Sequence, residues 1–192
     1  MTSLIRTFIA VKVEPDMLLL QTLREMQMAF AAEPVKWVEE NNLHLTLKFL
    51  GDTFPDQLVK VSDELDSISR EFKEITCRLQ GFGYFKSRGM PRVLFVKIVD
   101  TEILEQLTGE LSNRLARIGF VPDPRGFNPH LTLARIKFLR NKKVFYQMVE
   151  KYKNDFMQQL IVRELVFYQS ILNPSGPVYK PLAVKKLTGR TI

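Results

Sequence analysis

Apolar and polar residues alternate with two different periods along this 192-residue chain. A period of two predicts a β-strand with one buried face, whereas apolar residues three and four positions apart predict a helix with a buried stripe. We therefore expect strands at residues 4–13, 43–50, 74–84, 92–99, 160–172 and 178–187, one further strand that starts at residue 130, and helices at 15–32, 55–72, 101–118 and 142–154.

Proline and glycine mark where several of these elements end. Pro15 and Pro34 stand at the two ends of the first helix, as expected for residues that begin and stop helices. Residues 86–91 are basic and contain both Gly and Pro, which predicts a mobile surface loop. No low-complexity segment or linker interrupts the chain, so we expect one domain or two small lobes that share an interface.

Both histidines of the chain lie in the same tetrapeptide, His44-Leu45-Thr46-Leu47 and His130-Leu131-Thr132-Leu133. In a strand the leucines of each copy would face the core, while the histidine and threonine would share the opposite face. An imidazole exchanges protons near neutral pH, and a hydroxyl two residues along donates a hydrogen bond to a phosphate oxygen. The pair of motifs predicts an active site with an acid, a base and two oxygen-binding hydroxyls.

The two copies belong to a longer internal similarity at an offset of 86 residues. Residues 6–11 map onto 92–97 at this offset, and the helix that begins at 15 maps onto the one that begins at 101. The chain therefore reads as two similar halves. Chance similarity between unrelated strand–helix–strand segments is the alternative.

Composition indicates a soluble protein with a basic surface. The chain is 45% hydrophobic but has no apolar run of membrane length, and its first residues predict a strand and not a signal peptide, so we expect a cytoplasmic location. The single Cys77 predicts a buried, inert thiol. A net charge of +7 attracts polyanions such as RNA, although many basic proteins bind no anion.

These residues resemble the 2H phosphoesterase superfamily, and within it the RNA 2′,3′-cyclic phosphodiesterases, long labelled 2′-5′ RNA ligases. The resemblance rests on the doubled motif, the opening at residues 6–10, the lead at residues 126–129, Ala134-Arg135 and a late Tyr179. It implies an α+β fold over residues 1–192: a bilobal, duplicated unit in which two antiparallel sheets line a central groove, with helices on the outside. It also implies cofactor- and metal-free hydrolysis of cyclic RNA ends to 2′-phosphates, with ATP-free 2′-5′ joining as the reverse reaction.

The resemblance assigns roles to the motif residues. His44 would donate a proton, His130 would accept one, and Thr46 and Thr132 would hold the non-bridging oxygens. In-line opening of a cyclic phosphodiester needs an acid and a base on opposite sides of phosphorus, and two histidines supply both. Asn128 stands where the family usually has Arg, and Arg125 is a candidate replacement.

Further substrate-binding candidates carry alternatives. Lys48 shares strand parity with His44 and Thr46, but a solvated edge lysine fits equally well. Arg135 would need a β-bulge to reach the groove, because five residues after His130 a regular strand faces the other way.

Four more candidates complete the set. Arg6 and Arg92 are paired by the offset and either line the groove or are ordinary strand-end charges. Arg88 in the basic loop is a candidate for the RNA backbone. Tyr179 would stack on a base, or is an ordinary strand aromatic.

Other functions compete with the phosphodiesterase interpretation. Zinc is disfavoured because there is no third histidine and Cys77 lies in no ligand motif. The main rival is a non-catalytic RNA-binding module, in which aromatic residues stack on bases. A small cyclic nucleotide is an alternative substrate to RNA ends such as tRNA halves or oligonucleotides. We expect a monomer.

Overall fold

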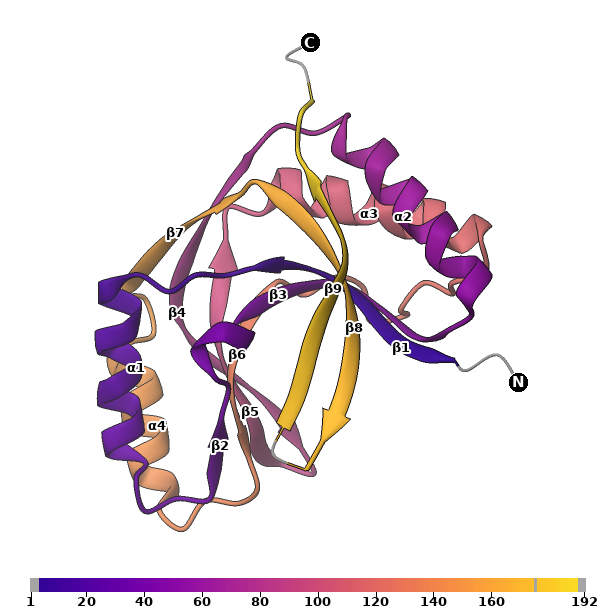
Figure 1. Ribbon diagram of the computed structural model, residues 1–192. Helices are drawn as coiled ribbons and strands as arrows, with labels where there is room; N and C mark the ends of the chain where they lie inside the picture. The colour runs from indigo at the N-terminus through magenta and orange to yellow at the C-terminus, as the bar shows by residue number, and fades with distance from the viewer. Residues whose placement is uncertain (1–3, 175, 190–192) are drawn as a thin grey trace.

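The computed structural model describes residues 4–174 and 176–189 (Figure 1). Its helices are α1 (Met17–Ala29), α2 (Pro55–Ser69), α3 (Glu102–Arg117) and α4 (Lys142–Lys151), with a short 3₁₀ turn, η1 (Glu40–Asn42). Its strands are β1 (Ile5–Lys12), β2 (Val35–Trp37), β3 (His44–Thr53), β4 (Ile75–Ser87), β5 (Met90–Val99), β6 (His130–Ile136), β7 (Phe156–Val162), β8 (Glu164–Asn173) and β9 (Gly176–Lys186). No helix of the described residues is long and apolar enough to span a bilayer.

All strand pairs are antiparallel. The strand order is symmetric about its centre, where the two motif strands β3 and β6 are neighbours and each has its equivalent partner, β1 or β5, on its other side. The order is β7-β4-β5-β6-β3-β1-β8-β9, with β2 also paired to β6. The expected α+β fold is confirmed, with its two antiparallel halves joined edge to edge in one curled sheet. A single residue pair, Leu45 with Leu131, joins β3 to β6. We call this junction the seam.

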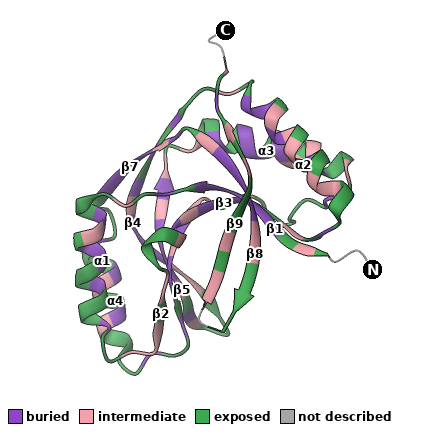
Figure 2. Ribbon diagram, viewed as in Figure 1, coloured by how far each residue is buried: buried purple, intermediate pink, exposed green. Residues whose placement is uncertain are grey.

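The helices cover one face of the curled sheet, and we call the opposite, uncovered face the groove face or groove. α1 and α4 pack against the lobe that contains β4 and β7, whereas α2 and α3 pack against the lobe that contains β3, β8 and β9. Figure 2 shows buried residues along the strands and on the inner sides of the helices. Leu45 and Leu131 are fully buried in this core, as the alternation predicted.

Two predicted elements differ from the observed ones. The expected single strand at 160–172 is two strands that break at Arg163: β7 pairs with β4, and β8 pairs with β1. The strand-like pattern continues through Arg163, so it does not indicate that the chain changes from pairing with β4 to pairing with β1. The expected loop at 86–91 is a tight hairpin between β4 and β5, whose turn residues Arg88 and Gly89 both have positive φ, +50° and +75°. This conformation matches the twist of paired strands.

Gly81 allows β4 to pass close to the chain after α4. Its φ is +72°, and a Cβ there would lie 2.0 Å from the carbonyl oxygen of Lys153. Gly51 has a similar φ, +74°, but open space where its Cβ would be.

We predict that Gly81→Ala destabilises the fold more than Gly51→Ala. The positive φ costs an alanine about 1–2 kcal/mol at either position. Overpacking against the Lys153 carbonyl adds about 1–3 kcal/mol at position 81 alone. Urea unfolding of both variants measures the difference, and equal losses of unfolding free energy would contradict the predicted clash.

Candidate active site

The seam brings both motifs together. Leu45 and Leu131 are directly opposite in an antiparallel pair, so the register sets His44 opposite Thr132 and His130 opposite Thr46. Because the leucines point into the core, these four polar side chains lie on the groove face. The groove therefore holds two imidazole–hydroxyl sets, each built from both halves of the chain.

A backbone carbonyl holds each imidazole in the same way. Nδ1 of His44 donates to the carbonyl oxygen of Asn42 at 2.7 Å, and Nδ1 of His130 donates to that of Asn128 at 2.6 Å. Since a carbonyl oxygen only accepts, Nδ1 carries the proton and Nε2 is left to exchange protons with a substrate. The sequence interpretation missed Asn42 and noted Asn128 only as a departure from the family pattern, although the wider repeat N-x-H-L-T-L contains both.

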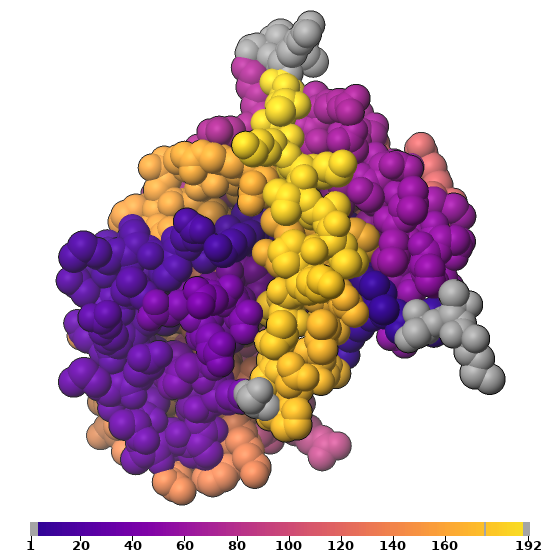
Figure 3. Space-filling model, viewed as in Figure 1, coloured from indigo at the N-terminus to yellow at the C-terminus, as the bar shows by residue number. Residues whose placement is uncertain are grey.

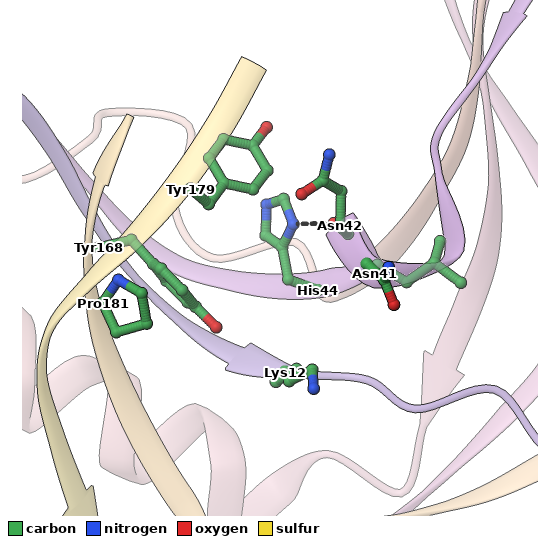
Figure 4. A pocket seen from close by; sticks show the side chains of 8 residues that line it. Lys12, Asn41, Asn42, His44, Tyr168, Tyr179 and Pro181 are labelled. Carbon is green, nitrogen blue, oxygen red and sulfur yellow. Dashed lines mark hydrogen bonds between the residues drawn. The ribbon is translucent and has the colours of Figure 1, made fainter. Parts of the chain in front are cut away.

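His44 borders a pocket of about 190 Å³ between β3, η1 and the β8–β9 hairpin (Figure 4). The ring of Tyr179 on β9 meets that of His44 edge-on at 5.1 Å, and Phe8 lies 5.2 Å from it. In Figure 3 the yellow β9 borders a hollow beside the purple segment that leads into β3. The remaining lining residues are Lys12, Asn41, Asn42, Leu43, Tyr168 and Pro181.

His130 has an aromatic environment of its own. Phe85 and Phe95 meet its ring edge-on at 4.9 and 5.3 Å. Burial lowers the pKa of His130 below its ordinary 6.5, against the carbonyl of Asn128, which raises it. Burial also lowers the pKa of His44; the carbonyl of Asn42 raises it, and a charge on His130 lowers it further. Both imidazoles are therefore biased toward the neutral form.

A β-bulge turns Lys48 away from the groove, which corrects the parity argument. Lys48 pairs with Ile9 and Thr46 with Ala10, so Leu47 is an extra residue in β3. Lys48 consequently shares the core face with Ile9, where its Nζ donates to the carbonyl of Val121 at 3.0 Å. A bulge reverses the facing of the residues that follow it, up to any further bulge, and strict alternation cannot anticipate this change.

The same kind of bulge in β6 turns Arg135 toward the groove. Thr132 pairs with Phe95 and Ala134 with Leu94, so Leu133 is the extra residue. Arg135 pairs with Val93, and Val93 pairs with Phe85, so the three side chains share one face of the sheet. Phe85 contacts the ring of His130, so this is the groove face. The bulge that this candidate required is present.

Positive charge also reaches Tyr179. Burial raises the pKa of the Tyr179 hydroxyl, whereas the charges of Arg135 and Arg6 lower it. These three candidates from different strands therefore lie within electrostatic range of one another.

Among the described residues, three other candidates form no hydrogen bond, ion pair or ring contact with either histidine. Arg125 is exposed and forms an ion pair with Asp123 that helps to hold the pKa of this carboxyl at about 2. His130 pairs with Lys97, so Arg92 lies about 17 Å away along β5 at about 3.3 Å per residue, and Arg88 lies farther still.

The offset also changes in this region. Lys12 of β1 pairs with His44, and Lys97 of β5 pairs with His130. These equivalent pairs show that β1 maps onto β5 at an offset of 85 residues and not 86. Arg6 therefore does not correspond to Arg92. The sequence interpretation missed the two lysines that pair with the histidines. An alignment of the two halves at an offset of 85 residues would have matched Lys12 with Lys97.

Two facing histidines on a duplicated antiparallel scaffold define a two-histidine phosphoesterase. The model of the LigT-like phosphoesterase family matches residues 11–95 and again residues 96–179. The chain belongs to this family, which confirms the resemblance inferred from the motifs.

Relatives and solved structures agree over nearly the whole chain. Proteins named RNA 2′,3′-cyclic phosphodiesterase from Thermotoga maritima and Methanocaldococcus jannaschii are 34% and 29% identical, over 92% and 91% of this chain and 92% and 96% of their own. A crystal structure of a protein from Thermus thermophilus gives a TM-score of 0.80 at 28% identity, covering 97% of this chain and 100% of its own. Escherichia coli LigT complexed with 3′-AMP gives 0.78 at 26%, covering 96% and 99%.

We predict that Asn42→Ala raises the pKa of His44 and leaves that of His130 unchanged. The Asn42 amide donates to the carbonyl of Pro177 on β9 at 3.3 Å, so its loss loosens the hairpin that buries His44. One hydrogen bond corresponds to a shift of up to about one unit. NMR titration of the two imidazoles measures it, with Asn128→Ala as the matched control. A shift at both histidines, or at neither, would contradict this coupling.

We predict that kcat/KM is bell-shaped with its maximum below pH 6.5. One neutral and one protonated histidine must coexist, and kcat/KM reports the free enzyme, where burial lowers both pKa values. A bound phosphate favours imidazolium, so the alkaline limb of kcat lies at higher pH than that of kcat/KM. Rates on a cyclic-phosphate dinucleotide across this range test it, and a kcat/KM maximum above pH 7 would contradict it.

Proposed function

We propose that the protein hydrolyses RNA 2′,3′-cyclic phosphate ends to 2′-phosphomonoesters without a metal. The observation that carries the proposal is the pair of imidazoles at the seam, each with Nδ1 bound to a carbonyl and Nε2 left for the groove. The names of the relatives support the RNA substrate.

In the proposed reaction, Nε2 of His130 takes a proton from water as the water oxygen attacks phosphorus. Nε2 of protonated His44 gives its proton to the ribose 3′ oxygen as the P–O3′ bond breaks, which leaves a 2′-phosphate. Thr46 and Thr132 donate hydrogen bonds to the non-bridging oxygens, where negative charge gathers. A 5′-hydroxyl in place of water gives ATP-free 2′-5′ joining.

The environment of the histidines favours catalysis over passive RNA binding. A module that only gripped phosphate would gain most from groups that stay charged at neutral pH. Here aromatic burial keeps both imidazoles poised to lose their protons, which suits an acid–base pair.

The organisation of the chain is part of this proposal. We infer that residues 1–192 form one bilobal domain that arose by duplication, at an offset of 86 residues at the motifs. The symmetric strand order and the double family match support this. Since one chain supplies both histidines, we propose a monomer, and an RNA substrate fits a cytoplasmic location.

We predict that the purified protein converts cyclic RNA ends to 2′-phosphates in excess EDTA. His44→Ala and His130→Ala should each lower kcat by on the order of 10²-fold or more, because each removes one proton-transfer partner. Phosphatases selective for 2′ or 3′ monoesters identify the product. A need for added metal, a purely 3′-phosphate product, or a single variant with near-normal kcat would overturn the mechanism.

A further inference from the structure

The positive charge of this protein is concentrated in two segments. Residues 75–99 contain five basic and no acidic residues, and residues 124–149 contain six basic and no acidic residues. The rest of the chain has 17 basic against 21 acidic residues, so it is net negative. These two segments account for the whole positive balance.

The fold brings the middle of each segment to one edge of the molecule. The β4–β5 hairpin turn, the end of β6 and the start of α4 lie together at the lower end in Figure 1. Six exposed cations lie there, which we call the basic rim: Lys86, Arg88, Arg92, Lys137, Lys142 and Lys143.

The cations of the basic rim are not used to stabilise the fold by ion pairs. Within residues 4–174 and 176–189, none of the six forms one, whereas Arg114 on α3 binds both Glu71 and Glu110. Lys142 and Lys143 stand in the first turn of α4, which contains no acidic residue. Cations at a helix N-terminus oppose the helix dipole, so local stability does not explain them.

Aromatic side chains are interleaved with the basic rim. Lys86 lies over the ring of Tyr84, which meets Tyr146 of α4 edge-on at 5.7 Å. Phe138 is 46% exposed beside Arg140. Cations that follow a backbone, with exposed rings between them, suit single-stranded nucleic acid. A membrane surface fits less well, because α4 buries its apolar residues Phe145 and Val149 in the core.

We propose that the basic rim binds the phosphate backbone of the RNA strand whose cyclic end lies between the histidines. The inference rests on the proposed function and extends it from the terminal nucleotide to the body of the substrate. His130 and Lys137 are seven residues apart along and just past β6, about 23 Å at about 3.3 Å per residue. A dinucleotide occupies the groove alone, whereas a longer RNA also reaches the rim.

The test compares two triple variants of equal charge. The rim variant is Lys137→Gln, Lys142→Gln and Lys143→Gln; the control is Lys60→Gln, Lys73→Gln and Arg117→Gln, three exposed cations of the α2–α3 lobe. KM and kcat are measured with a dinucleotide cyclic phosphate and with a cyclic-ended RNA of about twelve nucleotides. Fluorescence anisotropy gives Kd against salt for the same RNA with a plain 3′ end.

The expected result is specific to the long substrate. The rim variant should raise KM for the long RNA with unchanged kcat, lower the slope of log K against log salt by about 2, and leave the dinucleotide reaction unchanged. The control variant should match the unmodified protein. Equal behaviour of the two variants would overturn the proposal, as would a rim variant that lost binding to phosphatidylserine vesicles but not to RNA.

The two proposals fail separately. If the unmodified protein left the dinucleotide cyclic phosphate intact, the proposed activity would be wrong. The salt dependence of Kd for the RNA with a plain 3′ end, measured by anisotropy, would still test whether the basic rim binds RNA.

Discussion

The site depends on one short stretch of pairing, the seam between β3 and β6. Leu45 and Leu131 are its single residue pair, and both are fully buried on the helix-covered face. Their burial fixes the facing of both strands, so the residues on either side of each leucine must point into the groove. The hydrophobic core and the active site are therefore set by the same two leucines. A slip of one residue in either strand would turn its histidine into the core.

Beyond the seam, β-bulges decide which polar residues join the site. Both motif strands contain one extra residue at the last leucine of the motif, Leu47 and Leu133. The bulge sends Lys48 to the core side, where it binds the carbonyl of Val121 and so ties β3 to the loop before the second motif. The matching bulge brings Arg135 to the groove. The same kind of β-bulge thus gives Lys48 a structural role in one half of the chain and places Arg135 in the groove in the other.

Electrostatics act at two ranges in this molecule. Around the histidines, aromatic packing removes water and lowers both pKa values, which favours proton exchange over permanent charge. At the edge of the same sheet, the exposed cations of the basic rim, which form no ion pair with the residues that the structure describes, create a long-range field. None of the six rim cations is a cause of the lowered pKa of either histidine.

The two histidines, the inward leucines and the duplication of the motif follow from the amino-acid sequence alone, because each depends only on local periodicity or on repeated residues. The α+β class was implied by the resemblance that the sequence motifs carry. The sequence also indicated the family, through motif spacing. The facing of Lys48 and Arg135, the break at Arg163 and the hairpin at Arg88 and Gly89 could be read only from the folded chain. Each of these depends on which strand lies alongside. When two strands are far apart in sequence, packing across the sheet sets their register. The alternation of residues along one strand does not contain this information.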